Sequence, residues 1–323
     1  MILGVDIGGT TIKLGAVDEC AGRVVAELAF VTPQIGAQGV AQEIAVHARK
    51  LHSNYPDLHT AGVGVPGAMN RDRSLVRYPP NLHGWKEEPL RQYLQEALPE
   101  FNRIEVDNDA KVAALAEAKL GAGKGLSHFL LVTLGTGVGG AIYATLPPKE
   151  GGGQGVVDSI FRGASGGAGE FGHTTIDFNG PKCNCGSYGC IEAYLGQHYL
   201  SDRTKAKLLK NPTLSSPLRA EENELTPKLI FDAMTAGDAF ARSVFVEAGT
   251  LLGAAFASAA NLLDMHVFII GGGVAEAGPV LFDAALESLR ARVLANLRPV
   301  VEIRKAQFGN QAGMIGAAML VAG

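Results

Sequence analysis

The sequence has no strong excess of charge and no apolar run of membrane length. Its formal net charge is -4, which gives no electrostatic reason for binding nucleic acid or an anionic membrane. No uninterrupted apolar run reaches the roughly 18 residues that a membrane helix needs. Residues 1–7 are apolar but too short for a signal peptide, and they lack its basic leader. We therefore expect a cytoplasmic protein whose partner is a small molecule.

Two common nucleotide-binding signatures are also missing. No Gly-x-x-x-x-Gly-Lys-Ser/Thr and no His-Arg-Asp segment occurs, which argues against a P-loop NTPase and a protein kinase. Gly8 and Gly9 open a hairpin instead of a helix, so the dinucleotide fingerprint of a dehydrogenase fails as well.

Glycine, in contrast, is abundant and clustered. The 42 glycines gather at the ends of strand-like runs, above all in residues 2–17 and in residues 129–143. Each of these stretches reads as a strand, a turn rich in glycine and threonine, and a returning strand. Such a turn offers backbone N–H groups and hydroxyls to phosphate oxygens without a side chain in the way. One turn of this kind is often an ordinary hairpin, but two copies favour a phosphate site.

Between and after the two hairpins, helical and strand patterns alternate. The expected helices cover residues 40–53, 88–98, 110–120, 238–264, 279–295 and 311–322, and the expected strands cover 61–65, 103–107, 266–270 and 300–305. This order predicts mostly parallel, helix-covered sheets, and a chain of 323 residues predicts two domains. We expect an α/β protein of two similar lobes with a central cleft, the smaller lobe made of residues 1–120 and 306–323 and the larger of residues 121–305.

Three of the four cysteines lie within eight residues. Cys183, Cys185 and Cys190 follow His173 at a spacing typical of a Cys₃His zinc site, which is closed and therefore structural. The alternative is that these cysteines merely pack or form a disulfide. Thiols committed to a metal fit a reducing cytoplasm, and Cys20 is expected to be a plain surface thiol.

Together these motifs resemble the ROK family of sugar kinases, nearly from end to end. The matching segments are Asp6-Ile7-Gly8-Gly9-Thr10, Asn108-Asp109-Ala110, residues 134–140, residues 169–173, the cysteine segment 183–192 and Gly271-Gly272-Gly273. The sequence departs from the family at Lys111, where asparagine is common, and in the stretch 147–155, which we expect to form an exposed flap. The resemblance implies the two-lobed, actin-like (ribonuclease H-like) ATPase fold.

The resemblance also implies an activity, namely transfer of the ATP γ-phosphoryl group to a hexose hydroxyl. Glucose, giving glucose 6-phosphate, is the first candidate for the sugar, and N-acetylmannosamine, N-acetylglucosamine and fructose are alternatives. Mg²⁺ would accompany ATP, the zinc would be structural, and a homodimer is expected. The family also includes sugar-sensing repressors, but Asp6 begins the first motif so early that no helix-turn-helix domain fits before it. A non-catalytic sugar-sensing protein is the alternative of another class.

Specific residues take roles from this resemblance. Asp109, at a predicted strand end and helix start, is the candidate catalytic base, although a plain helix N-cap is the alternative. The candidate sugar-binding residues are Gly67, Asn81, Asn108, Asp109, Glu170, His173 and Glu192. The candidate nucleotide-binding residues are Asp6, Gly8, Gly9, Thr10, Thr11, Lys13, Gly135, Thr136, Gly137, Gly272 and Gly273.

Overall fold

The computed structural model describes residues 1–145, 160–221 and 224–322, so the predicted flap at 147–155 lies outside the described residues. Contacts divide the chain into two compact units. Unit 1 comprises Met1–Ser127, Ala141–Gly169 and Ala306–Gly323, and unit 2 comprises His128–Gly140 and Glu170–Lys305. The predicted lobe boundaries at 120 and 305 lie near the borders after Ser127 and Lys305. The predicted lobes did not include the return of Ala141–Gly169 to unit 1. The assignment of lobes therefore stays a prediction.

Unit 1 is built on a five-stranded sheet with the order β3-β2-β1-β4-β8. The strands are β1 (Ile2–Ile7), β2 (Thr11–Asp18), β3 (Arg23–Val31), β4 (Thr60–Val65) and β8 (Arg103–Asn108). β1 and β2 form the predicted hairpin, antiparallel, with Asp6 opposite Lys13. β4 runs parallel to both β1 and β8, so the ends of β1 and β8 lie at the same edge of the sheet. β3, which was not among the predicted strands, extends the hairpin on its outer side.

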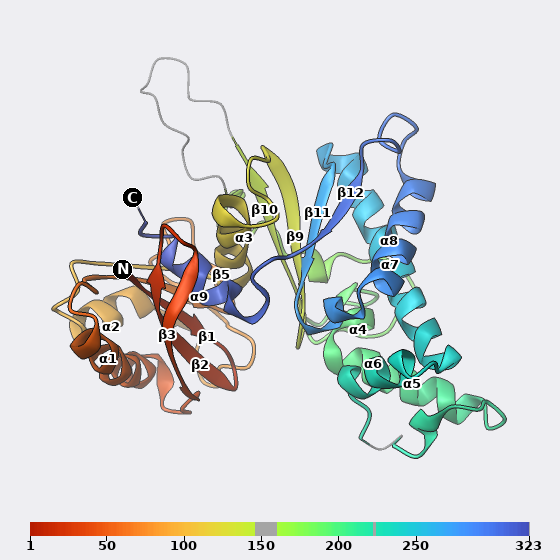
Figure 1. The fold of residues 1–323 in the computed structure, drawn as a ribbon, viewed down its shortest axis with the longest axis horizontal. Coiled ribbons are helices and arrows are strands. Elements are labelled where there is room, and N and C mark those ends of the chain that lie inside the picture. The colour runs from red at the N-terminus through yellow and green to blue at the C-terminus, as the bar shows by residue number, and fades with distance from the viewer. Residues whose placement is uncertain (146–159, 222–223, 323) are drawn as a thin grey trace. The chain divides into compact units, whose positions relative to one another are not determined.

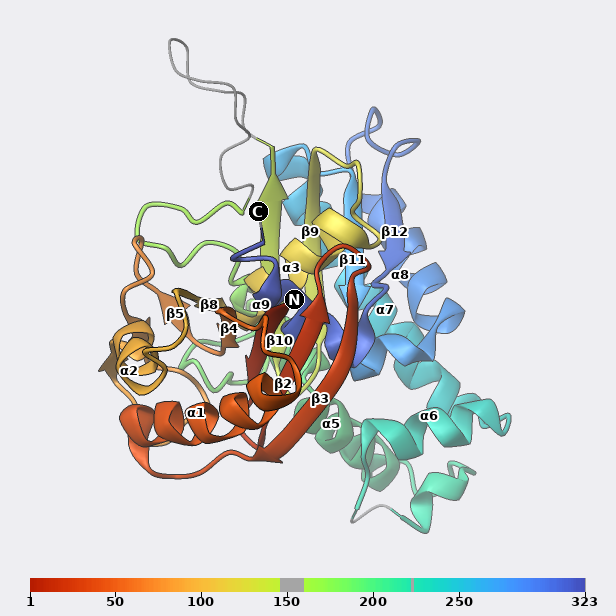
Figure 2. The same cartoon turned by 60° about the vertical axis from the view of Figure 1, so that its left-hand side comes forward.

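Four helices accompany this sheet: α1 (Gly36–Asn54), α2 (Leu90–Ala97), α3 (Asp109–Leu120) and α9 (Ala312–Ala318). The apolar face of α1 predicted from residues 40–53 is buried and joins the sheet and α2 in one hydrophobic core. The chain's last helix, α9, packs against α3, β1 and β4, and Figures 1 and 2 both show it beside β1. A small second sheet of β5 (Ala68–Met69), β6 (Val76–Arg77) and β7 (Glu87–Glu88) follows β4.

Unit 2 repeats the plan on a four-stranded sheet with the order β10-β9-β11-β12. Its strands are β9 (His128–Leu134), β10 (Val138–Ala144), β11 (Val267–Gly271) and β12 (Glu302–Lys305), and the last residues of β10 belong to unit 1. β11 runs parallel to β9 and to β12, as the predicted strands require. Its helices are α4 (Glu192–Leu195), α5 (Gln197–Lys210), α6 (Pro227–Thr235), α7 (Ala239–Leu263) and α8 (Pro279–Arg292).

Helix α7 is the one helix in the described part of the chain that is long and apolar enough, by length and composition, to cross a membrane. More than half of its most apolar window, 56%, is buried. Gly249 and Gly253 bring its backbone close to α8, because a Cβ atom on Gly253 would lie within 2.1 Å of the Ala285 carbonyl oxygen. These features are those of a core helix in unit 2.

Candidate active site

The first candidate phosphate turn joins β1 to β2. The Gly8 N–H donates to the Thr11 carbonyl at 3.0 Å, which closes the turn. Thr32, after β3, fastens it from outside, because its hydroxyl donates to the Gly8 carbonyl at 2.6 Å and its N–H donates to the Thr10 carbonyl at 2.9 Å. Thr32 was not among the predicted residues, because it lies far from the turn along the chain and no local sequence pattern links the two.

Asp6 lies at the end of β1, directly before this turn. Burial, and after it the charge of Asp109, raises the pKa of the Asp6 carboxyl to about 6, while Lys13 opposes the rise. Two carboxylates that disfavour each other's ionisation create a negative site that a cation would relieve. The predicted nucleotide-binding residue Asp6 is thus in electrostatic contact with the predicted base, and Lys13 is in electrostatic contact with Asp6.

Asp109 is the first residue of α3, and Asn108 is its N-cap. The Asn108 side-chain oxygen accepts from the Lys111 N–H at 3.2 Å, so capping is the function of Asn108 and not of Asp109. Asp109 Oδ1 accepts from the Ala110 N–H at 2.8 Å and from Asn108 Nδ2 at 2.9 Å. Burial raises the pKa of Asp109, and these two hydrogen bonds oppose the rise. The plain-cap interpretation of Asp109 is therefore wrong.

Gly67 and Asn81 lie beside these residues in unit 1. Asn108 Nδ2 also donates to the Gly67 carbonyl at 3.1 Å. Gly67 has a φ of 103°, and Asn81 approaches the phosphate turn so closely that a Cβ atom on Gly9 would be 2.6 Å from the Asn81 Cβ. Unit 1 therefore gathers its predicted phosphate and sugar residues in one connected set.

The second candidate phosphate turn joins β9 to β10 in unit 2. The Gly135 N–H donates to the Gly137 carbonyl at 3.0 Å. Glu192 Oε2 accepts from the Val138 N–H at 2.9 Å, and a Cβ atom on Gly137 would lie 2.4 Å from that oxygen. Glu192, predicted as a sugar ligand, thus also holds the second turn, which the sequence pattern did not indicate.

The predicted metal ligands converge in unit 2. The ligand atoms of His173, Cys183, Cys185 and Cys190 all lie within 4.8 Å of one another. Cys185 Sγ and Cys190 Sγ are 3.7 Å apart, and Cys183 Sγ is 3.8 Å from His173 Nδ1. A tetrahedral zinc with bonds of about 2.3 Å to sulfur separates its ligands by about 3.8 Å. The four residues therefore fit a tetrahedral ion, and the cysteines are free thiols, not a disulfide.

Two glycines shape this metal loop, residues 173–190. Gly189 has a φ of 66°, and a Cβ atom there would lie 1.8 Å from the Asp177 carbonyl oxygen. Gly186, with a φ of 93°, turns the chain between Cys185 and Cys190. Burial raises the pKa of the Cys183 thiol to about 12, so a bound cation would be needed to hold its thiolate at neutral pH.

The predicted sugar ligand Glu170 directly precedes a short 3₁₀ helix, Phe171–His173, and the predicted ligand His173 is its last residue. Both side chains are exposed, while Phe171 and Gly172 are buried. His173 turns Nδ1 toward Cys183, which leaves Nε2 on the other side of the ring. The metal loop therefore sets the position of one candidate sugar ligand directly.

A cavity of about 760 Å³ opens beside Gly273, one of the predicted nucleotide-binding residues. Gly272 follows β11 with a φ of 90° and approaches β9, where a Cβ atom would lie 2.4 Å from the Leu134 carbonyl oxygen. The lining includes Gly273, Val274, Gln197, Phe231, Phe245 and Glu276. Gly273 was predicted, whereas the aromatic residues come from distant helices and were not.

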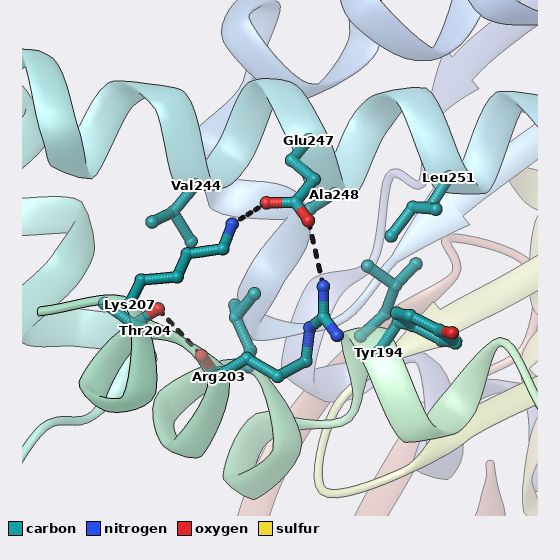
Figure 3. Close-up of a pocket in the computed structure, with 10 residues that line it drawn as sticks. Tyr194, Arg203, Thr204, Lys207, Val244, Glu247, Ala248 and Leu251 are labelled. Atoms are coloured by element: carbon teal, nitrogen blue, oxygen red, sulfur yellow. Dashed lines mark hydrogen bonds and ion pairs between the residues drawn. The ribbon is translucent and has the colours of Figure 1, made fainter. Parts of the chain in front are cut away.

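Figure 3 shows a much smaller hollow between α5 and α7. Lys207 and Arg203 both pair with Glu247, with Arg203 Nη2 at 2.9 Å from Glu247 Oε1. The Arg203 guanidinium also lies over the Tyr194 ring, 4.5 Å from its centroid. The volume of about 10 Å³ leaves room for no more than one water. We assign this cluster to packing, and the Tyr194 hydroxyl, which donates to Asp177 Oδ2 at 2.7 Å, links it to the metal loop.

Comparison with known proteins decides the family. A sequence model of the ROK family matches residues 2–323. The chain belongs to the ROK family. This ROK protein is 36% identical to a glucokinase of Halalkalibacterium halodurans, over 99% of the chain and 94% of the relative. Two solved structures are also similar. One is a ROK family glucokinase from Streptomyces griseus in complex with glucose and AMPPNP, with a TM-score of 0.83, 33% identity and coverage of 99% and 98% of the two chains. The other is the ROK hexokinase of Thermus thermophilus, with a TM-score of 0.76, 31% identity and coverage of 98% and 96%.

These findings confirm the predicted family and the α/β, two-lobed, actin-like fold class. The predicted site residues of this ROK protein fall into two groups. One group forms a connected set in unit 1, around Asp6 and Asp109. The remaining predicted residues lie in unit 2, around Glu192 and the metal loop.

Proposed function

We propose that this protein is an ATP-dependent hexokinase that phosphorylates glucose to glucose 6-phosphate. The observation that carries the proposal is Asp109, held at the first turn of α3 by Asn108 and placed in electrostatic contact with Asp6 beside a glycine turn. This is the arrangement of a base next to a phosphate site. Similarity to glucokinases over nearly the whole chain supports it.

Asp109 would take the proton of the attacking sugar hydroxyl. Both hydrogen bonds described above go to Oδ1, so we assign the proton to Oδ2. Asn108 Nδ2 fixes the carboxylate while its oxygen caps α3, which ties the position of the base to the helix. Gly67, Asn81, Asn108, Glu170, His173 and Glu192 are the groups proposed to bind the sugar.

The two glycine turns would bind the phosphate oxygens through backbone N–H groups. The base of ATP would enter the 760 Å³ cavity beside Gly273. Mg²⁺ bound with ATP supplies neutralisation of phosphate charge, and the mutually repelling carboxylates Asp6 and Asp109 fit a cation nearby. The Cys₃His cluster would hold zinc as a closed, structural site.

The identity of the sugar, the cellular compartment and the oligomeric state are proposed in addition to the family assignment. We propose a cytoplasmic homodimer, as the sequence analysis predicts. N-acetylmannosamine, N-acetylglucosamine or fructose would use the same base and turns, and a sugar sensor would keep the binding residues without turnover.

A coupled ADP-release assay with Mg·ATP and a panel of hexoses and N-acetylhexosamines tests the proposal. We expect turnover with glucose to exceed that with the other sugars. In Asp109→Asn, kcat should fall by about 10² to 10⁴-fold while glucose still binds, because only the base is lost.

Asp57→Asn is the matched control, since Asp57 is an exposed carboxylate in the same unit. Preference for an N-acetyl sugar would keep the mechanism and change the substrate. Turnover in Asp109→Asn equal to that of the control would overturn the role of Asp109, and glucose binding without any turnover in the unmodified protein would indicate a sensor.

A further inference from the structure

Residues 160–169 of unit 1 are tied to the turn that carries Asp109 at two points. Arg162 reaches Asp107, with Nη1 at 3.0 Å from Oδ1 and Nη2 at 2.6 Å from Oδ2. Lys111 Nζ donates to the Gly166 carbonyl at 2.5 Å. Asp107 and Lys111 stand immediately before and after Asn108-Asp109-Ala110, so both ends of this turn are fastened to the same segment.

This segment packs closely, at Gly166, against the backbone of Met69 and Asn70. Gly166 has a φ of 96°, and a Cβ atom there would lie 2.3 Å from the Met69 carbonyl oxygen and 2.8 Å from the Asn70 carbonyl carbon. A side chain at this position would displace the carbonyl that receives Lys111. The anchor for Lys111 is therefore a fixed part of unit 1.

Both charged partners are buried and therefore need to be paired. Asp107 and Lys111 expose 0% and 1% of their surfaces, and burying charge is unfavourable unless it is paired. A positive charge in the first turn of a helix also opposes the helix dipole. Lys111 is thus placed against the helix dipole. Its charge lowers the pKa of Asp109 and opposes the effect of burial.

We propose that Arg162 and Lys111 are positioning residues that clamp the Asn108–Asp109 turn to residues 160–169 and so hold the catalytic base in place. The inference rests on the proposed role of Asp109 in phosphoryl transfer. Arg162 acts through the bidentate pair with Asp107, whose Oδ1 also accepts from the Asn108 N–H at 2.8 Å. Lys111 acts through Gly166 and through its charge near Asp109.

Arg162→Met and Lys111→Met test the clamp. A base displaced by about 1 Å loses roughly 10²-fold in rate, so kcat should fall by about 10 to 100-fold. The KM values for glucose and ATP should change by less than about 3-fold, because the clamp acts on the reacting group more than on binding. Arg162→Lys keeps the charge but not the bidentate geometry, and should give an intermediate kcat.

Arg49→Met is the matched control, because Arg49 forms an exposed ion pair with Glu100 in the same unit and at 2.7 Å. Its kcat should stay within about 2-fold of the unmodified protein. If Lys111→Met does not fold, the two Arg162 variants decide whether the clamp positions the base. Arg73 stays 4.0 Å from Asp107 Oδ2 and limits the unpaired charge in those variants.

Hydrogen exchange separates failure of the clamp from failure of the proposed function. Arg162→Met should speed the exchange of the Ala110 and Lys111 amides by about 10-fold, whatever the activity of the protein, and Arg49→Met should not. Faster exchange together with reduced kcat supports the proposal. Unchanged exchange and unchanged kcat in folded variants would overturn it. If the unmodified protein phosphorylates no sugar, the proposed function fails, while the exchange result still decides whether the clamp exists.

Discussion

Asp6 is a single residue whose ionisation should be visible in the stability of the whole protein. Its pKa in the folded state is about 6, against an ordinary value of 3.8. Between these two pH values the folded state holds a proton that the unfolded state has lost. The free energy of unfolding contributed by Asp6 is therefore highest below about pH 4 and falls as the pH rises to about 6.

Asp6→Asn should remove this dependence. Above pH 6 the variant should be more stable than the unmodified protein by up to about 3 kcal/mol, and below pH 4 the two should be equal. Urea denaturation at several pH values between 4 and 7.5 measures the difference, and groups that do not interact with Asp6 cancel. A difference that stayed constant over this range would contradict the raised pKa of Asp6.

At the scale of single residues, the motifs predicted where Asp109 lies along the chain but not all of its contacts. Asp109 was placed correctly at the junction of a strand and a helix, because Asn108 gives a strong N-cap signal. Lys111 departs from the motif that the sequence resembles, yet its partner, Gly166, lies 55 positions away. Pairing over such a distance leaves no periodic pattern in the sequence. The clamp could therefore be recognised only in the structure.

Among the elements, the metal loop offers the clearest test. Its ligands lie at tetrahedral separations. The loop contains His173, and Glu192 follows it at the start of α4, so the loop borders two candidate sugar ligands. Removal of the ion should free the loop, lower the melting temperature by roughly 5 to 10 °C, and raise the KM for glucose. Binding should weaken as the pH falls, since three thiols must lose their protons.

Cys185→Ser should reproduce these effects, and Cys20→Ser is the control, because Cys20 is an exposed free thiol outside the cluster. Metal analysis of the purified proteins, with thermal unfolding and glucose kinetics, measures the outcome. Unchanged melting temperature and KM in protein shown to be free of metal would exclude a structural role for the ion.

The elements also differ in how well the sequence predicted them. The two hairpins and the long helices α1, α7 and α8 were expected because their periodic patterns are long. The two-residue strands β5, β6 and β7 were missed, since strands so short are defined by their pairing and have no period of their own. The same holds for Thr32, which fastens a turn formed more than twenty residues earlier.

For the whole molecule, the path of the chain makes its last helix part of the first unit. α9 lies against three elements through backbone contacts: a Cβ atom on Gly4 would be 2.1 Å from the Met314 carbonyl oxygen, and one on Gly62 would be 1.7 Å from that of Ala317. On α9 itself, a Cβ atom on Gly316 would be 1.8 Å from the Val112 carbonyl oxygen of α3. α9 therefore closes the core of unit 1 and supports the helix that begins with Asp109.

Gly316→Ala should show this dependence. In an ordinary helix this change stabilises by about 1 kcal/mol, but here we expect a loss of about 3 kcal/mol, because backbone atoms of α3 must move. The matched control is Gly39→Ala in α1, where the nearest atoms belong to the exposed side chain of Ile35 and the effect should stay within about 1 kcal/mol. Urea denaturation compares the free energies of unfolding of the two variants, and kcat reports on the position of the base, Asp109. Because α3 carries Asp109, the folded fraction of Gly316→Ala should also turn over more slowly than Gly39→Ala. Equal stability of the two variants would mean that α9 is not packed on α3 through its backbone.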